Sequence, residues 1–384
     1  MTDKSRTNIP TFDAGEILEG VRRWVEVESP SHDAAAVNRL VDIVQNDFGR
    51  IGAAAHRTPG RDGFGDILEV RSPWGNHDEP GLLILGHLDT VHPIGSLATT
   101  HKFRREGDAV FGPGIYDMKA GSYLAYYALQ HFVREGRTTP LPVRILYIPE
   151  EEVGSPTSRP AIEAAARNAK YVLVMEPARD GDKCVTSRKG WGRFDMTITG
   201  RASHAGSKPE EGRSALNELA RQILDLESMT DFETGVSVVV GMAQGGSAPN
   251  VVPAEAKATI DLRVPPTVDA DAVVRRILDR KPFTPDCQVV VTGGINRPPY
   301  AKNEGIAALF RHAQACAAEF GYKLEDTPLT GGVSDGNFPA ALGIPTLDGL
   351  GPYGRGAHAI DEQIAYSTLV PHAQLLVRLM DTLR

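Results

Sequence analysis

The chain has 384 residues, 41% hydrophobic and 23% charged, which is enough for two domains with substantial cores. Its formal net charge of −8, with no run of basic residues, excludes a general attraction to nucleic acid or to anionic membranes. Three widely spaced cysteines exclude a disulfide framework, and the lack of an apolar leader or membrane-spanning stretch leads us to expect a cytoplasmic protein.

The first half of the chain alternates predicted strands with predicted helices. The segment 81–85 is a continuous apolar run, which is typical of a strand buried on both faces. Such alternation indicates an α/β sheet of largely parallel strands. The predicted helices are 14–27, 33–51, 118–135 and 161–168, and the predicted strands are 66–71, 81–85, 143–148 and 171–175.

The pattern changes near residue 187 and changes back near residue 300. Between them the predicted order is strand, helix, strand, strand, helix, strand, which is typical of ferredoxin-like domains. We therefore expect a discontinuous catalytic domain, residues 1–187 and 300–384, with a mixed, largely parallel sheet flanked by helices. Residues 188–299 are expected to form an inserted α+β domain. Its strands are 193–199, 236–240, 256–264 and 288–291 and its helices 214–226 and 269–278; helices 305–320 and 365–383 and a strand at 346–347 follow it.

Histidines and carboxylates follow several predicted strands. His87 and Asp89 follow the strand 81–85, Glu150-Glu151-Glu152 follow 143–148, and Glu176 follows 171–175. Ligands bind outside the carboxyl ends of strands in open α/β sheets. Asp117, at the end of a Gly/Pro-rich loop, and the late His358 complete the set.

Each of these residues also has a plain structural explanation as a turn, a helix cap, a solvated acidic loop or a structural histidine. Together, two histidines and several carboxylates suit a pair of divalent metals, most simply Zn²⁺, with Co²⁺ or Mn²⁺ as alternatives. Such a pair supports hydrolysis when one further glutamate transfers protons.

The motifs GHLDTV, GPGIYDMKAG, EEEVGS, VMEPA, GRASHAG, NVVPAEA, DLR and GRGAHA occur in this order over nearly the whole chain. This set resembles the M20 metallopeptidase family, especially its glutamate carboxypeptidase branch, the carboxypeptidase G2 type. The resemblance implies that one metal is bound by His87 and Glu176 and the other by Glu152 and His358. Asp117 would bridge the metals, Glu151 would be the general base, and Asp89 would orient His87.

The resemblance also assigns roles in the inserted domain, which would be a lid and a homodimerisation domain. His204, in Ser203-His204-Ala205-Gly206, would reach the partner's active site and stabilise the oxyanion. Asn250 and Arg263 match lid positions that approach the substrate. Arg297 matches a position that would grip a substrate carboxylate, a task that suits the planar guanidinium. Plain alternatives are a surface histidine for His204 and a solvent-exposed hinge residue for Arg297.

The sequence departs from the carboxypeptidase G2 type at Met118, where that type has a second aspartate, and this weakens the assignment of substrate. The predicted function is hydrolysis of an amide bond next to a free carboxylate. The enzyme would release a C-terminal, acidic amino acid or deacylate an N-acyl amino acid; a dipeptidase or a deacetylase of the same family is the alternative. A non-catalytic metal-binding protein is a remote alternative.

A serine hydrolase is a formal rival, because Gly332-Val333-Ser334-Asp335-Gly336 fits the pattern of a nucleophile elbow. The residues before it, 324–331, are not a buried strand, and only about 24 residues separate Ser334 from His358. No acid between them fits the layout of that fold, so the context disfavours this reading.

Overall fold

The fold is that of a computed structural model, which describes residues 9–384; residues 1–8 of the expected catalytic domain lie outside it. The chain divides into two compact units. The first unit contains the described residues up to Thr186, together with Lys302–Leu329 and Ser334–Arg384. The second unit contains Ser187–Ala301 and the short segment Thr330–Val333. Among residues 9–384, no helix combines the length and the apolar character needed to cross a membrane.

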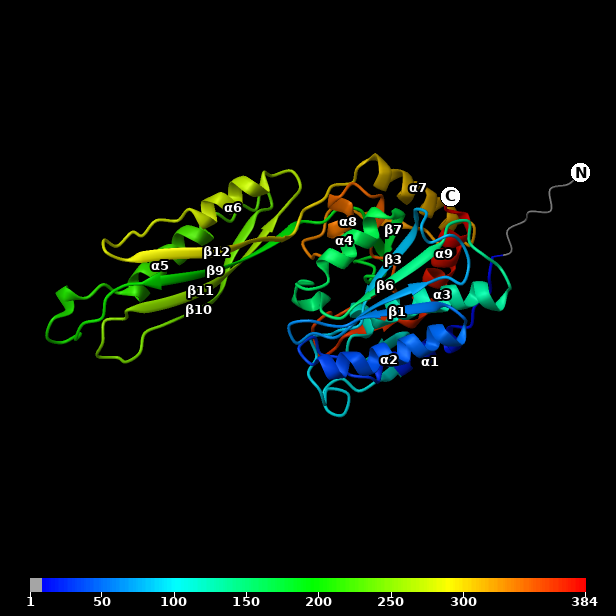
Figure 1. Ribbon diagram of the computed structural model, residues 1–384, viewed down its shortest axis with the longest axis horizontal. Coiled ribbons are helices and arrows are strands. Elements are labelled where there is room, and N and C mark those ends of the chain that lie inside the picture. The colour runs from blue at the N-terminus through cyan, green and yellow to red at the C-terminus, as the bar shows by residue number, and fades with distance from the viewer. Residues whose placement is uncertain (1–8) are drawn as a thin grey trace, which may run out of the picture. The chain divides into compact units, whose positions relative to one another are not determined.

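A six-stranded mixed sheet is the centre of the first unit (Figure 1). The β3 strand pairs in parallel with both β6 and β7, and β7 pairs in parallel with β14, whereas β1 and β2 are antiparallel. The expected mixed, largely parallel sheet is therefore confirmed. Its spatial order is β1 (Ala54–Thr58), β2 (Ile67–Arg71), β6 (Val143–Ile148), β3 (Gly81–His87), β7 (Ala169–Val174) and β14 (Thr346–Leu347).

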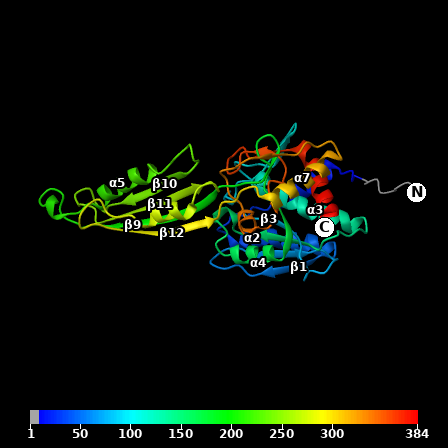
Figure 2. The same ribbon diagram turned by 90° about the horizontal axis from the view of Figure 1, so that it is seen from above.

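Apolar side chains on both faces of this sheet explain why its central strands read as continuous apolar runs. In β3, Leu82 and Ile84 join the larger core, while Leu83 and Leu85 point to the smaller core on the opposite face. Helices cover both faces of the sheet. Residues of α4 and α8 belong to the smaller core, and residues of α1, α2, α3, α7 and α9 belong to the larger one. Figure 2 shows α3, α7 and the red α9 gathered near β3.

Three helices of the first unit, α1, α2 and α7, begin at capping residues that the sequence carries. The side chains of Asp13, Asp33 and Asn303 each accept a backbone N–H in the first turn of their helix. The helices are α1 (Ala14–Val25), α2 (Ala34–Arg50), α3 (Ala120–Arg134), α4 (Arg159–Arg167), α7 (Glu304–Ala318), α8 (Asn337–Ala341) and α9 (Leu369–Thr382).

The second unit is a four-stranded antiparallel sheet with two helices, and its order along the chain is the predicted one. The strands lie in the spatial order β10, β11, β9, β12 (Figure 1). Every second residue of β9, such as Phe194, Met196 and Ile198, is buried against the helices. The elements are β9 (Gly190–Thr199), α5 (Ala215–Glu227), β10 (Ser237–Gly245), β11 (Glu255–Val264), α6 (Ala270–Leu278) and β12 (Gln288–Arg297).

The structure differs from the sequence-based expectation mainly at short elements. The chain makes a helical turn at Ile115–Lys119 before α3 begins, whereas one helix was expected from Met118. The last helix begins at Leu369 because 363–365 is a strand. The strands that had no counterpart in the prediction are β4 (Arg104–Glu106), β5 (Ala109–Phe111), β8 (Lys183–Val185), β13 (Glu325–Thr327), β15 (Gly354–Arg355) and β16 (Gln363–Ala365), along with β1. Two of their pairings, β8 with β13 and β5 with β16, join segments far apart in the sequence, and most of these strands have only two or three residues, too few to show a periodicity.

Candidate metal centre and active site

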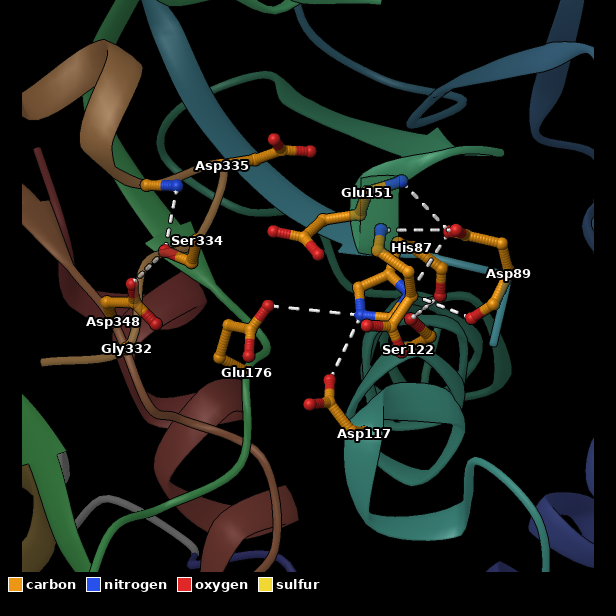
Figure 3. Close-up of polar contacts among 12 residues, drawn as sticks. His87, Asp89, Asp117, Ser122, Glu151, Glu176, Gly332, Ser334, Asp335 and Asp348 are labelled. Carbon is orange, nitrogen blue, oxygen red and sulfur yellow. Dashed lines mark hydrogen bonds and ion pairs between the residues drawn. The ribbon is translucent and has the colours of Figure 1, made fainter. Parts of the chain in front are cut away.

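Three neighbouring parallel strands, β6, β3 and β7, end at one edge of the sheet. His87 is the last residue of β3, Glu151 and Glu152 lie in a short helical turn just after β6, and Glu176 comes just after β7. Asp117 reaches the same place from the turn before α3 (Figure 3). The sheet therefore brings together side chains that are far apart in the sequence, as its topology predicts.

The first group of potential metal ligands is His87, Asp117 and Glu176, whose ligand atoms all lie within 4.8 Å of one another. The Nε2 atom of His87 is 3.1 Å from Oδ1 of Asp117 and 3.9 Å from Oε1 of Glu176. The side chains of His87 and Glu176 are almost wholly buried. Nearby buried carboxylates repel one another, and a divalent cation relieves that repulsion.

The second group is Asp117, Glu152 and His358, again within 4.8 Å. The Nε2 atom of His358 is 2.9 Å from Oε2 of Glu152 and 3.7 Å from Oδ2 of Asp117. Asp117 thus turns one carboxylate oxygen to each group, as a bridging ligand would. The donor set of two imidazoles and three carboxylates suits two divalent ions of the zinc type.

The charges of this cluster shift several pKa values. Burial opposes the protonated form of His87, but hydrogen bonds with Asp117 and Asp89 raise its pKa well above the usual value. Burial likewise opposes ionisation of Asp117, yet His87, Arg179 and His358 hold its pKa below the usual range.

The pKa values of Glu152 and His358 are also shifted. Burial and the charge of Asp117 raise the pKa of Glu152 to about 7, and the hydrogen bond with Glu152 raises the pKa of His358 to about 9. Strong mutual perturbation of this kind is typical of functional sites.

Asp89 is fully buried and connects His87 with the glutamate turn. Its backbone oxygen is 3.0 Å from Nδ1 of His87, and its carboxylate Oδ1 is 3.3 Å from the same atom. Its two carboxylate oxygens also accept the backbone N–H groups of Glu151 and Glu152, at 3.1 and 3.2 Å. One aspartate therefore fixes both the imidazole ring and the turn that carries the two glutamates (Figure 3).

The three consecutive glutamates occupy different environments. Glu150 is fully buried, and its carboxylate accepts hydrogen bonds from the backbone and hydroxyl groups of Thr157 and Ser158 at 2.7–3.0 Å. Glu152 belongs to the second ligand group. Glu151 lies between them, and its charge contributes to raising the pKa of His87. Only Glu150 is committed to a purely structural role.

The remaining predicted residues, His204, Asn250, Arg263 and Arg297, lie in the second unit. His204 and Asn250 are exposed neighbours, because the backbone of Asn250 accepts the N–H of Ala205 at 2.9 Å. Arg263 and Arg297 flank Trp191, with guanidinium carbons 5.6 and 6.0 Å from its ring centroid.

The plain alternative for Arg297, a solvent-exposed hinge residue, is wrong, because only 1% of this residue is exposed.

Sequence reasoning missed three residues that contact predicted site residues. Glu362 accepts the backbone N–H of Asp117 at 2.9 Å. Arg179 places Nη2 3.9 Å from Oε2 of Glu176. Trp191 separates the two arginines of the second unit. None of these three residues belongs to a recognisable sequence motif. Only their contacts in the folded structure identify them.

Ser334 does not have the environment of a nucleophile. Its side chain is fully buried, and its hydroxyl donates to Oδ2 of Asp348 at 2.5 Å. A serine nucleophile needs a base that accepts its proton and an exposed position on a sharp turn. The contacts of Ser334 in the described residues are therefore structural, and the serine hydrolase reading has no support.

The peptidase family M20/M25/M40 matches residues 83–382 of the chain. The chain belongs to this family. It is therefore a metal-dependent hydrolase, and the resemblance to M20 metallopeptidases is confirmed. Carboxypeptidase G2 of Pseudomonas sp. is 30% identical over 363 residues, covering 92% of this chain and 86% of that protein. Succinyl-diaminopimelate desuccinylase of Coxiella burnetii is 26% identical, covering 93% and 97%.

Solved structures of M20 enzymes share this fold. An M20 family metallo-carboxypeptidase from Sulfolobus solfataricus superposes with a TM-score of 0.72 at 17% identity, covering 97% of this chain and all of that one. A dinuclear metal binding peptidase of the M20 family from Bacillus subtilis gives a TM-score of 0.64 at 15% identity, covering 96% and 97%.

Proposed function

We propose that this M20 enzyme is a two-metal amidohydrolase that cleaves an amide bond next to a free carboxylate. It would act as a carboxypeptidase that releases a C-terminal, acidic residue, or as an N-acyl-amino-acid amidohydrolase. The observation that carries the proposal is the position of Asp117, whose two oxygens face two separate ligand groups. The carboxypeptidase G2 relative supports the choice of substrate class.

In this proposal His87 and Glu176 hold one metal, Glu152 and His358 hold the other, and Asp117 belongs to both. Zinc is the proposed metal, and Co²⁺ or Mn²⁺ are alternatives. Metals held in this way polarise a carbonyl oxygen and lower the pKa of a bound water. Family membership and the donor set support this assignment.

Glu151 is the proposed general base. It takes a proton from the attacking water as the water oxygen bonds to the amide carbon. The carbon–nitrogen bond then breaks, and Glu151 returns the proton to the leaving nitrogen, so that the products are a carboxylic acid and an amine. Asp89 keeps the Glu151 turn and the His87 ring in place through the contacts described above.

Residues 188–299 are proposed to form the lid and dimerisation domain, next to a catalytic domain of residues 1–187 and 300–384. His204 of one subunit would donate to the oxyanion that forms in the other, and Asn250 and Arg263 would approach the substrate. The exposure of His204 and Asn250 supports roles that need an incoming group. We further propose a homodimer with a cytoplasmic location.

Arg297 is proposed to bind the free carboxylate of the substrate. Arg297→Lys is expected to raise KM about 10- to 100-fold with a smaller change in kcat. The reason is that lysine keeps the charge but loses the planar fork, and a hydrogen bond to a charged group is worth about 1.5–3 kcal/mol. Steady-state kinetics measure the effect, and Arg193→Lys, an exposed arginine of β9, is the matched control. Unchanged KM in Arg297→Lys would remove Arg297 from this role.

The experiment that tests the proposed function is hydrolysis of a panel of N-acyl amino acids, acyl-Glu and acyl-Asp included. Each compound is incubated with metal-stripped enzyme and with enzyme restored with zinc or cobalt. We expect release of one amino acid, only by the restored enzyme. Two metals bound per chain without hydrolysis of any panel member would count against the proposed substrate class.

A second candidate within the same chemistry is a dipeptidase or a deacetylase of the same family. The succinyl-diaminopimelate desuccinylase relative, 26% identical over 93% of this chain, favours removal of an acyl group. N-succinyl substrates and free dipeptides therefore belong in the panel. Preference for either over acyl-Glu would select this candidate.

A further inference from the structure

Glu362 is a buried carboxylate surrounded by four hydrogen-bond donors. It lies directly before β16, and only 1% of the residue is exposed. Its Oε2 atom accepts the backbone N–H of Gly114 at 2.9 Å and Nε2–H of His92 at 2.6 Å. Its Oε1 atom accepts the backbone N–H groups of Tyr116 and Asp117, each at 2.9 Å.

These donors explain why a carboxylate is required here. The turn 114–117 precedes α3, and its N–H groups would otherwise be buried without acceptors, which is costly. A carboxylate accepts at both oxygens, whereas an amide would turn an NH2 group toward one pair of donors. Glu362 therefore holds the backbone that presents Asp117 to the two ligand groups.

Glu362 also belongs to the loop that carries His358. The N–H of Glu362 bonds to the carbonyl of Ala359 at 3.3 Å, and the N–H of Ala359 bonds to the carbonyl of Gly356 at 2.9 Å. His358 itself has a φ of 65°, a left-handed conformation that a non-glycine residue adopts only when its surroundings hold it. The buried side chain of Glu362 thus connects the loop that carries Asp117 with the loop that carries His358.

Two further histidines support this junction from the side. The ring of His101 lies 4.3 Å from the ring of His92, and its Nε2 is 3.0 Å from the carbonyl oxygen of Ala359. His92 contacts Glu362, and His101 contacts the His358 loop. Neither histidine belongs to the two ligand groups found in the described part of the chain.

We propose that Glu362 is a positioning residue that sets the separation between Asp117 and the Glu152–His358 pair, and so sets the affinity of the chain for both metals. The proposal rests on the proposed two-metal function. Glu362 does not touch the substrate; it acts through the backbone of Asp117 and the loop of His358.

The test is Glu362→Gln, which keeps the shape of the side chain but removes acceptors for the turn 114–117. Metal-stripped full-length protein is titrated with Zn²⁺ against a competing chromophoric chelator. The visible spectrum of the cobalt-loaded protein reports the geometry of the ligands. We expect an affinity loss of about 10- to 100-fold, the usual effect of removing a partner that orients metal ligands, and a changed cobalt spectrum.

Glu218→Gln is the matched control. Glu218 of α5 is also fully buried, and its carboxylate accepts two backbone N–H groups, those of Phe283 and Thr284, at 3.0 and 2.7 Å. It lies in the second unit and belongs to neither ligand group. The same chemical change should therefore lower thermal stability without changing zinc affinity or the cobalt spectrum.

The outcomes separate this inference from the proposed function. If the wild-type chain does not bind two metals, the proposed function fails. If it does, and Glu362→Gln binds zinc within about twofold of Glu218→Gln, the positioning role is wrong. If Glu362→Gln does not fold, the variant His92→Leu replaces it, because it removes one of the four donors to Glu362. We expect His92→Leu to weaken zinc binding by a smaller factor. Unchanged zinc binding in His92→Leu would overturn the proposal.

Discussion

Glu151→Gln is expected to lower kcat by about 10²- to 10⁴-fold while both metals stay bound, because a positioned general acid–base contributes a factor of this size. Glutamine keeps the size of the side chain and its place in the turn after β6, but it cannot take the proton of the attacking water. The measurement is kcat on the best substrate of the panel, with metal content determined on the same sample.

The matched control for this prediction is Glu163→Gln. Glu163 lies on α4 and pairs with Arg159 at 2.8 Å, so the change removes a carboxylate that is outside the ligand groups. Its kcat should stay within about twofold of wild type, as surface ion pairs contribute little. Normal turnover in Glu151→Gln would show that another group is the base.

Asp117→Ala is expected to weaken the binding of both metals and to lower kcat by at least about 10³-fold, because metal activation supplies several kcal/mol to hydrolysis. His358→Ala should instead remove only the metal that it shares with Glu152. Metal content after dialysis, measured for each variant, distinguishes the two cases.

His56→Ala is the control for loss of a histidine, since His56 is exposed on β1 and belongs to neither group. Two tightly bound metals in Asp117→Ala would contradict the shared role of this aspartate. Loss of both metals in His358→Ala would contradict the division into two groups.

The fold could be predicted in most of its long elements because local signals agree with the tertiary structure. Capping residues such as Asp33 and Asn303 mark helix starts, and the run 81–85 marks a strand buried on both faces. The pattern of residues after position 187 predicted the order of strands and helices from β9 to β12. The short strands could not be predicted, because β5 exists only through pairing with β4 and with β16, about 250 residues later.

The sequence predicted those residues of the candidate site that directly follow predicted strands. His87, Glu152 and Glu176 follow parallel strands, so sheet topology alone brings them together. His358 lies in an irregular loop, and only the resemblance assigned it to a particular metal. Glu362 was missed because a buried glutamate that accepts backbone N–H groups has no sequence signature. The roles of these residues stay predictions until the variants are measured.

Two residues near the ends of the segment Ser187–Ala301 are hydrogen-bonded to each other. Arg188 and Tyr300 exchange both backbone N–H···O bonds, at 3.1 and 3.2 Å. A segment of more than 100 residues therefore leaves and returns at nearly one point, between Thr186 and Lys302. Insertions, replacements or deletions within such a segment therefore leave unchanged the path of the chain through the sheet that carries the ligand groups. Under the roles proposed for the two units, substrate choice would then change in one unit while the hydrolytic machinery is preserved in the other.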